Sequence, residues 1–397
     1  MADVTIPQLE KLYATHRCTV TQVVRWYIAR IEKYDGIYQA IETRDFAGAL
    51  ATAAREDASA ANSARPALWG VPIVIKANTS IKGLATTDGW TGFVIPGHEL
   101  MPPKDATVVA RLRAAGAVIL GKTNMPDFAG GNTTRSTSFG RTGNAYDVRF
   151  SPGGSSGGTV TAVSANFAVF GTGTDTSNSI RMPASTSAVV GVLPTRGVTS
   201  ITGIAPLDWL LDNTGPIARN VTDSAIALEV MAGEDPEDFR TKGSQAAAQP
   251  GPYTKYLNGN ALKGKRFGVP AFAVDNPAPT QAGPGRQSSL QPETRAMFMK
   301  PWMSCAPPEP PSCSKTPFCP RLFRKPSRPS TRGPTGVTEP KPSSETTAPQ
   351  GTIQRPITRM LLAPRCRLPL QDSRAPPGPV LLQLVPLEPQ PRPLFHK

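Results

Sequence analysis

The segment GVPIVIKANTSIKGLATTDG, residues 70–89, opens with an apolar, β-branched run and continues into a polar stretch. Short runs of this composition, bounded by glycine and polar residues, are typical of strands that are buried on both faces of a sheet. The apolar run ends at Lys76. The sequence therefore predicts a central strand over residues 70–75 with a lysine at its end.

Amphipathic patterns and a further apolar run flank this strand. Before it, apolar residues recur at spacings of three and four, which predicts a helix that packs on the main body. After it, Asp105 can cap a helix that ends at Gly116 and leads into a strand over residues 117–120. The apolar residues of the first helix are Val20, Val23, Val24, Tyr27, Ile28 and Ile31, and those of the second are Val108, Val109 and Leu112.

The same alternation of patterns continues along the chain. It predicts a helix over residues 157–166, a strand over 167–171, a helix over 221–231 and another strand over 265–269. Helices that alternate with short buried strands are typical of layered α/β folds. We therefore expect an α/β fold, and we find no internal repeat.

Histidine is scarce, which restricts the kinds of catalysis open to the chain. A nucleophilic serine is most often activated by a histidine. His16 falls in the N-terminal helical region, His98 in a Pro/Gly-rich loop and His396 close to the last residue, all far from any segment typical of a nucleophile. We expect solvated, non-catalytic roles for all three, so a nucleophilic serine here needs another base.

The segment SPGGSSGG, residues 151–158, places four glycines around two serines. Alone, this composition is typical of a flexible linker. The apolar, periodic residues 159–170 follow it directly, and linkers do not normally open a buried helix. The flanking sequence therefore favours a loop whose glycines permit unusual backbone angles beside a ligand.

A second polar loop, GTGTDTSNSIR, occupies residues 171–181 and follows a predicted strand. Open α/β sheets bind their ligands at such positions, and the peptide N–H groups of the loop can hold an anion. A phosphate-binding loop is the alternative interpretation, but its characteristic Gly-Lys-Ser/Thr ending is missing from this segment.

Taken together, these segments resemble the amidase signature family. The resemblance runs from about residue 20 to residue 300, and it includes the 24-residue step from Ser155 to Ser179. It implies an α/β/α sandwich with a mixed central sheet. The matching segments, in chain order, are GVPIVIKANTSIKGLATTDG (70–89), GNAYDVRFSPGGSSGG (143–158), GTDTSNSIRMPASTSAVVGVLPTRG (173–197) and LLDNTGPIARNVTDSA (210–225).

The resemblance implies a Ser-Ser-Lys apparatus for the hydrolysis of amides. Position by position, it makes Lys76 the base, Ser155 the bridging serine and Ser179 the nucleophile, with a cis peptide bond between Gly154 and Ser155. A serine hydroxyl is a poor nucleophile near neutral pH, whereas a desolvated lysine favours its neutral, basic form. The bridging serine would relay the proton to the lysine and later to the leaving amine, and water would hydrolyse the acyl-enzyme.

The residues around this apparatus receive supporting roles from the same resemblance. Backbone N–H groups of the loop before the nucleophile would form the oxyanion hole. The family commonly has Gly-Gly where this chain has Ser177-Asn178, which keeps the backbone donors and predicts an altered loop geometry. The predicted oxyanion residues are Thr176, Ser177 and Asn178, together with Ser179 itself, and the predicted supporting residues are Ser156, Asp175 and Arg181.

Two other lysines are alternative bases. Lys82 precedes a glycine in a polar turn, and Lys122 follows Gly121 after a predicted strand. Both positions predict a solvated side chain rather than a base.

The composition changes after Lys300. Residues 301–397 hold 23 of the 43 prolines and lack sustained helix or strand periodicity, which predicts disorder. The peptide Pro-Trp-Met-Ser-Cys at 301–305 can be encoded CCC TGG ATG AGC TGC, which two bases later reads Leu-Asp-Glu-Leu. Continued in that frame, a helix, a glycine and a buried strand follow. We therefore expect a change of reading frame and an incomplete C-terminal part of the domain, with a native Pro-rich interaction tail as the alternative.

Most of the net charge of +14 belongs to this tail, since residues 1–300 contribute +5 and residues 301–397 contribute +9. A nucleic-acid-binding protein would need basic residues on a folded face, so nucleic-acid binding is not expected. The cysteines of the tail lack zinc-finger spacing, and the resemblance implies neither a metal nor an organic cofactor. The N-terminus lacks a secretory pattern and no apolar run reaches membrane-spanning length, so we expect a cytoplasmic protein without membrane association.

These observations predict three regions: an N-terminal helical region over residues 1–64, a catalytic domain over 65–300, and the Pro-rich basic tail over 301–397. The predicted activity is hydrolysis of a small or cyclic amide, with a small-molecule substrate and a possible homodimer. The segments at 173–181 and 208–220 look more like stand-alone amidases, including hydrolases of cyclic amide dimers, than the A-type component of a tRNA amidotransferase. The alternatives are a catalytically inactive, shortened protein and a transamidase subunit.

Overall fold

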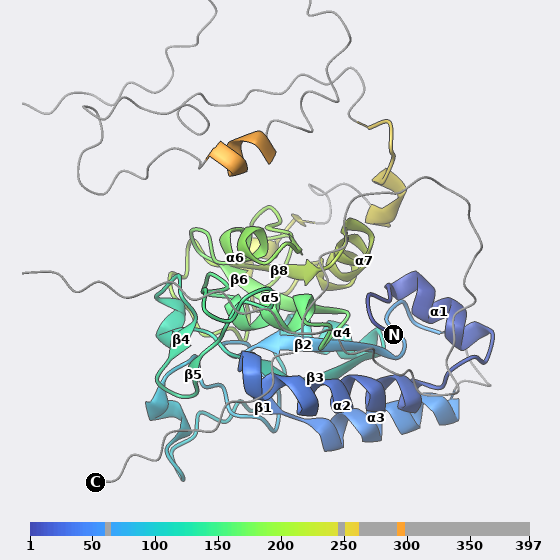
Figure 1. The fold of residues 1–397 in the computed structure, drawn as a ribbon, viewed down its shortest axis with the longest axis horizontal. Helices are drawn as coiled ribbons and strands as arrows, with labels where there is room; N and C mark the ends of the chain where they lie inside the picture. Colours follow the sequence, from blue (N-terminus) through green and yellow to red (C-terminus); the bar gives the residue numbers. More distant parts are fainter. Residues whose placement is uncertain (60–64, 245–250, 262–291, 298–397) are drawn as a thin grey trace, which may run out of the picture. The chain divides into compact units, whose positions relative to one another are not determined.

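The computed structural model describes residues 1–59, 65–244, 251–261 and 292–297 (Figure 1). Contacts divide the chain into two compact units, and residues 1–257 belong to the first. The predicted strand at 265–269 and the predicted tail over 301–397 lie outside the described residues.

The first unit is built on a mixed six-stranded sheet with the strand order β1-β3-β2-β6-β8-β7. Strand β2 runs parallel to both β3 and β6, whereas β1, β8 and β7 are antiparallel to their neighbours. A second sheet pairs β4 with β5. The strands are β1 (Ile41–Arg44), β2 (Val71–Lys76), β3 (Ala117–Thr123), β4 (Arg135–Ser136), β5 (Gly140–Arg141), β6 (Phe170–Asp175), β7 (Val190–Gly191) and β8 (Asn213–Ala218).

Helices cover this sheet and complete an α/β/α sandwich, as predicted. Helices α2 and α3 run side by side and contact β2 and β3, while α4 packs against α7 (Figure 1). The α-helices are α1 (Ile6–Ala14), α2 (Val20–Tyr38), α3 (Phe46–Ser59), α4 (Thr107–Ala114), α5 (Gly157–Ser164), α6 (Arg181–Thr186) and α7 (Val221–Met231). The 3₁₀ helices are η1 (Thr91–Val94), η2 (Asp127–Ala129), η3 (Phe239–Thr241) and η4 (Tyr253–Tyr256).

The predicted helix after Thr19 is confirmed as α2. The Thr19 side chain accepts a hydrogen bond from the backbone of Gln22, whose side chain accepts one from the Thr19 backbone, so two N–H groups at the helix start are satisfied. The apolar face of α2 is buried in the same core cluster as β2 and β3. The N-terminal helices therefore share one hydrophobic core with the sheet.

Helix α4 is confirmed, but the prediction that Asp105 caps it is wrong. The N-cap residue is Ala106, and its side chain has no capping hydrogen bond. The Asp105 carboxylate instead accepts a hydrogen bond from the backbone N–H of Lys82 and forms a 3.0 Å ion pair with Arg113. The carboxylate therefore pairs with these partners instead of with the N–H groups at the helix start.

The strand expected at residues 167–171 begins three residues later, and β6 continues to Asp175. The whole of β6 pairs residue by residue with β8, from Phe170 with Ala218 to Asp175 with Asn213. Phe167 instead packs in the core, with its ring 5.9 Å from that of Tyr38. The polar loop after the strand is therefore short, and Thr174 and Asp175 belong to the sheet. Among the described residues, no helix is both long enough and apolar enough to cross a membrane.

Candidate active site

Lys76 is the last residue of β2, and its side chain is fully buried. Its Nζ donates hydrogen bonds to Ser155 Oγ at 2.7 Å, to Thr174 Oγ1 at 2.7 Å and to Ser156 Oγ at 3.1 Å. The lysine that ends the first predicted strand thus meets both serines of the predicted glycine-rich loop. Neutral hydroxyls, rather than carboxylates, surround its amine.

Two segments supply these three hydroxyls. Ser155 and Ser156 precede α5, and Thr174 comes from β6, the parallel neighbour of β2. The Ser156 hydroxyl donates to the carbonyl of Thr174 at 3.2 Å, and Asn78 Nδ2 donates to Thr174 Oγ1 at 3.1 Å. Thr174 and Asn78 were not among the predicted site residues. The polar residues of GTGTD and KAN, at the ends of neighbouring parallel strands, were the signal that could have found them.

Ser179 lies in the loop between β6 and α6 and is 5% exposed. Its carbonyl accepts a hydrogen bond from the backbone N–H of Ser156 at 3.2 Å, which ties the two loops together. The peptide bond between Gly154 and Ser155 is cis, as predicted. Among the described residues, no hydrogen bond joins the hydroxyls of Ser155 and Ser179.

The predicted oxyanion residues Thr176, Ser177 and Asn178 form the rest of this loop. In the described part of the chain, their backbone N–H groups and that of Ser179 donate no hydrogen bond. Asp175 accepts from the backbone N–H of Ile180 at 3.0 Å and forms a 3.1 Å ion pair with Arg181. Arg181 also donates to the Ser177 carbonyl. These contacts of Asp175 and Arg181 connect both ends of the loop.

Burial lowers the pKa of Lys76 to about 7, against the opposing negative charges of Asp88, Asp175 and Asp212. Desolvation disfavours the charged form of an amine, and the surrounding hydroxyls carry no compensating charge. Burial also raises the pKa of Asp88 to about 7. Lys76 therefore exchanges its proton close to neutral pH, as a general base requires.

The prediction that Lys122 is solvated is wrong, whereas Lys82 is exposed as predicted. The Lys122 side chain is fully buried in β3, and its Nζ donates to the Ala85 carbonyl at 2.7 Å. Burial lowers its pKa to about 8, with Glu42 and Asp88 acting in the opposite direction. A lysine that follows an apolar run and a glycine predicts the start of a solvated turn, but β3 continues to Thr123 and its neighbours cover both faces.

His16 and His98 are exposed, and His396 lies outside the described residues. No three His, Cys, Asp or Glu side chains converge as ligands for a metal ion within the described ranges.

Comparisons with known proteins show which family the chain matches. Residues 22–283 match the model of the family described as Amidase. The chain is 44% identical over 244 residues to the A component of the glutamyl-tRNA(Gln) amidotransferase of Moorella thermoacetica, covering 61% of this chain and 48% of that protein. It is 40% identical over 273 residues to the corresponding protein of Streptomyces coelicolor, covering 68% and 53%. The chain thus spans about half the length of these curated relatives.

Solved structures match the same part of the chain. The peptide amidase of Stenotrophomonas maltophilia is 35% identical with a TM-score of 0.61, and the match covers 66% of this chain and 54% of that one. A bacterial aryl acylamidase of the amidase signature family is 26% identical with a TM-score of 0.55, covering 60% and 49%.

Proposed function

The chain belongs to the amidase signature family, and on that premise we propose that it hydrolyses the C–N bond of a small or cyclic amide through Lys76, Ser155 and Ser179. The observation that carries the proposal is the 2.7 Å hydrogen bond between Lys76 Nζ and Ser155 Oγ in a fully buried site. An amine with a pKa near 7 can accept a proton from a hydroxyl relay at neutral pH.

The partners of Lys76 support a neutral amine that faces Ser155. Neutral lysine has two N–H groups and one lone pair. Ser156 directs its own hydroxyl hydrogen to the Thr174 carbonyl, and Thr174 Oγ1 accepts a second donor, Asn78. Ser156 Oγ and Thr174 Oγ1 are therefore suited to accept the two N–H groups of neutral Lys76. This leaves the nitrogen lone pair to accept the hydroxyl hydrogen of Ser155.

The proposed reaction begins when the Ser179 hydroxyl attacks the amide carbonyl. Its proton passes to Ser155, whose own proton passes to Lys76, and collapse of the tetrahedral intermediate returns a proton by the same route to the leaving nitrogen. Water then hydrolyses the acyl-enzyme with the same relay. Hydrogen bonds of this kind often tighten in the complex with substrate, and we expect the hydroxyls of Ser155 and Ser179 to approach each other there.

Four backbone N–H groups of the loop that ends at Ser179 have no acceptor among the described residues, which supports an oxyanion hole there. We assign this role to the N–H groups of residues 176–179, which belong to a loop braced by Asp175 and Arg181. A fixed donor of this kind contributes about 3 kcal/mol to stabilisation of the transition state. The side chains of Ser177 and Asn178 leave these backbone donors in place.

The proposal is tested with the full chain, Ser179→Ala and Lys76→Ala, on a panel of linear and cyclic amides and with a serine-reactive fluorophosphonate. We expect the unmodified chain to hydrolyse at least one amide and to be labelled at Ser179. Ser179→Ala should lose both properties because it lacks the nucleophile. Equal labelling and hydrolysis by the chain and Ser179→Ala would show that the assignment is wrong, and a folded chain with neither property would support the inactive alternative.

The identity of 37–44% to the A components of glutamyl-tRNA(Gln) amidotransferases favours a second candidate function, that of a transamidase subunit. Such a protein would depend on partner chains. The same amide panel distinguishes the two: hydrolysis by the chain alone supports the stand-alone amidase, whereas activity that appears only with tRNA and the other amidotransferase components supports the second function.

A further inference from the structure

We infer that Asp212 is a positioning residue for the proposed hydrolysis, because it fixes Thr176 at the start of the loop that carries Ser179. The inference rests on the proposed function. Asp212 immediately precedes β8 and is only 6% exposed. It was not among the residues predicted from the sequence.

The Asp212 carboxylate joins two loops. One oxygen accepts the hydroxyl of Thr176, the first residue after β6. The other accepts the backbone N–H of Leu207 at 2.9 Å, and both oxygens lie 3.2 Å from the N–H of Asp208. A buried carboxylate that accepts several hydrogen bonds has a fixed orientation. Rotating it would break one of these bonds, which costs free energy because water cannot replace the lost donor.

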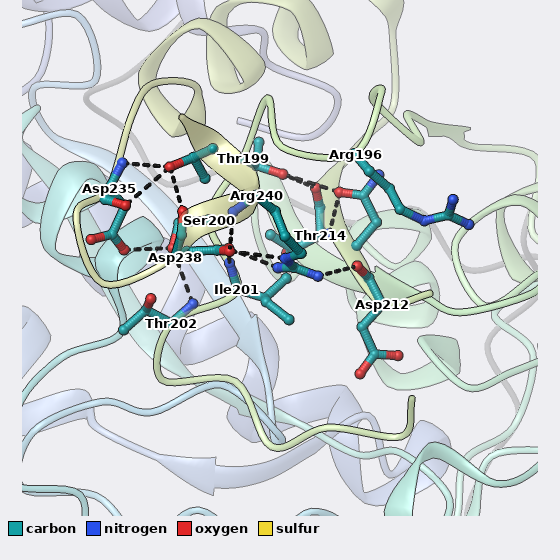
Figure 2. Close-up of polar contacts among 12 residues, drawn as sticks. Arg196, Thr199, Ser200, Ile201, Thr202, Asp212, Thr214, Asp235, Asp238 and Arg240 are labelled. Carbon is teal, nitrogen blue, oxygen red and sulfur yellow. Dashed lines mark hydrogen bonds and ion pairs between the residues drawn. The ribbon is translucent and has the colours of Figure 1, made fainter. Parts of the chain in front are cut away.

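A buried ion pair between Arg240 and Asp238 lies next to Asp212, and Arg240 also binds the Asp212 main chain (Figure 2). Arg240 binds Asp238 through two nearly parallel hydrogen bonds of 2.8 and 2.7 Å, and the side chains are 10% and 0% exposed. The third nitrogen of Arg240 donates to the carbonyls of Trp209 at 3.0 Å and of Asp212 at 3.2 Å. Figure 2 shows the Asp212 carboxylate pointing away from Arg240, so backbone and side chain are held by different partners.

The loop that carries Ser179 is thereby fixed at both ends. Asp175 holds its far end through the N–H groups of Ile180 and Arg181. Thr176, at the near end, depends on Asp212 for a side-chain hydrogen bond. Asp175 and Asp212 lie at the same end of the pairing of β6 with β8, since Asp175 is opposite Asn213 in the register. Four consecutive N–H groups can converge on one oxyanion only if both ends of this short loop are fixed.

A neighbouring buried aspartate lacks these connections. Asp235 accepts a hydrogen bond of 2.6 Å from Ser200 (Figure 2). It also accepts one of 2.6 Å from Thr107 and one from the backbone of Glu237. These partners stabilise the segment around η3, and among the described residues none of these hydrogen bonds involves residues 176–180. Burial and hydrogen bonding alone therefore do not distinguish a positioning residue, whereas the contact with Thr176 does.

The experiment is a double-mutant cycle of Asp212→Asn and Thr176→Val in the full chain, with kcat and KM normalised to the Ser179 sites that a fluorophosphonate titrates. We expect each single variant to lower kcat about 10- to 100-fold, with a smaller change in KM, because the loop donors act mainly on the transition state. The kcat of the double variant should be no lower than that of the less active single variant, since both changes act on the same contact between Thr176 and residue 212. Thr176→Ser, which keeps the hydroxyl, should retain more kcat than Thr176→Val.

A second readout separates positioning from a folding defect. The charge of Asp212 raises the pKa of Lys76, as do those of Asp88 and Asp175, so Asp212→Asn should shift the acid limb of kcat/KM to lower pH. Loss of folded protein lowers the number of titrated sites and leaves this limb in place. Glu237→Gln, which removes an exposed carboxylate beside Asp238, is the matched control and should match the unmodified chain in every parameter.

Additive losses in the cycle, or Asp212→Asn with an unchanged kcat per site, would overturn the role of Asp212 while leaving the proposed hydrolysis intact. A chain without Ser179-dependent hydrolysis would overturn the proposed function, and the positioning role with it.

Discussion

Lys76 and Lys122 lie on neighbouring parallel strands, and the register places Lys122 opposite Ile75. Both side chains are fully buried, and burial lowers the pKa of both amines, to about 7 and about 8. Their partners differ. Lys76 is surrounded by three hydroxyls, whereas Lys122 has a close backbone carbonyl, that of Ala85, and a Thr86 hydroxyl 3.4 Å away.

The difference teaches that a depressed lysine pKa does not by itself mark a base. A hydroxyl can give its proton to the amine and pass on another, but a carbonyl can only accept a hydrogen bond. Lys122 also lies near Glu42 and Asp88, whose pKa values burial raises to about 7. We therefore assign Lys122 to the stability of the fold and Lys76 to proton transfer.

The largest expected effect comes from replacing each lysine by methionine. Lys76→Met should lower kcat/KM about 10³-fold with the fold retained, because it removes the base of the relay. Lys122→Met should cost about 1–3 kcal/mol of unfolding free energy, since it leaves the Ala85 carbonyl without its donor, and should lower kcat/KM per titrated site far less. Steady-state kinetics and urea denaturation of both variants check this. Equal kinetic losses would erase the proposed distinction.

Removing one hydroxyl at each lysine makes a sharper comparison. Ser155→Ala should lower kcat/KM about 10²-fold because it interrupts the relay between Ser179 and Lys76. Thr86→Val removes the hydroxyl 3.4 Å from Lys122 and should change kcat/KM by less than about threefold. The measurement is kcat/KM per titrated site, and a large loss in Thr86→Val would place Lys122 in the reaction.

The pH dependence of hydrolysis should follow Lys76. Its amine must be neutral to accept a proton, so kcat/KM should fall about tenfold per pH unit below about 7 and reach a plateau above it. Lys122→Met should leave the midpoint of this limb close to that of the unmodified chain. If Lys122→Met shifts the midpoint of this limb and Asp212→Asn does not, the roles assigned to the two lysines would be reversed.

The smallest effect concerns the pH dependence of stability. The folded chain releases the proton of Lys122 near pH 8 and the unfolded chain near pH 10.5, so neutral Lys122 contributes stability above pH 10.5 that is lost as the pH falls through about 8. The unfolding free energy should therefore rise less steeply between these values in Lys122→Met than in the unmodified chain. Denaturation curves at several pH values measure the two slopes, and identical slopes would contradict a depressed pKa for Lys122.

Local sequence signals predicted most of the elements. The α2 helix has a strong apolar periodicity and the β2 strand is a short apolar run, and both lie where the sequence placed them. The errors occurred where distant partners decide the outcome. Asp105 pairs with Arg113 and Lys82 instead of capping α4, and β6 extends to Asp175 because β8 offers a matching partner strand.

The sequence by itself determined a layered α/β fold, because periodicity is a property of short segments. Its resemblance to the amidase signature family supplied the α/β/α architecture and the residues proposed for the Ser-Ser-Lys relay. Only the tertiary structure decided which of two lysines is surrounded by hydroxyls, and only it brought Asp212 to Thr176, 36 residues away in the chain. The physical reason is that desolvation and hydrogen-bond partners depend on neighbours contributed by other strands and loops. A residue's own segment does not encode them.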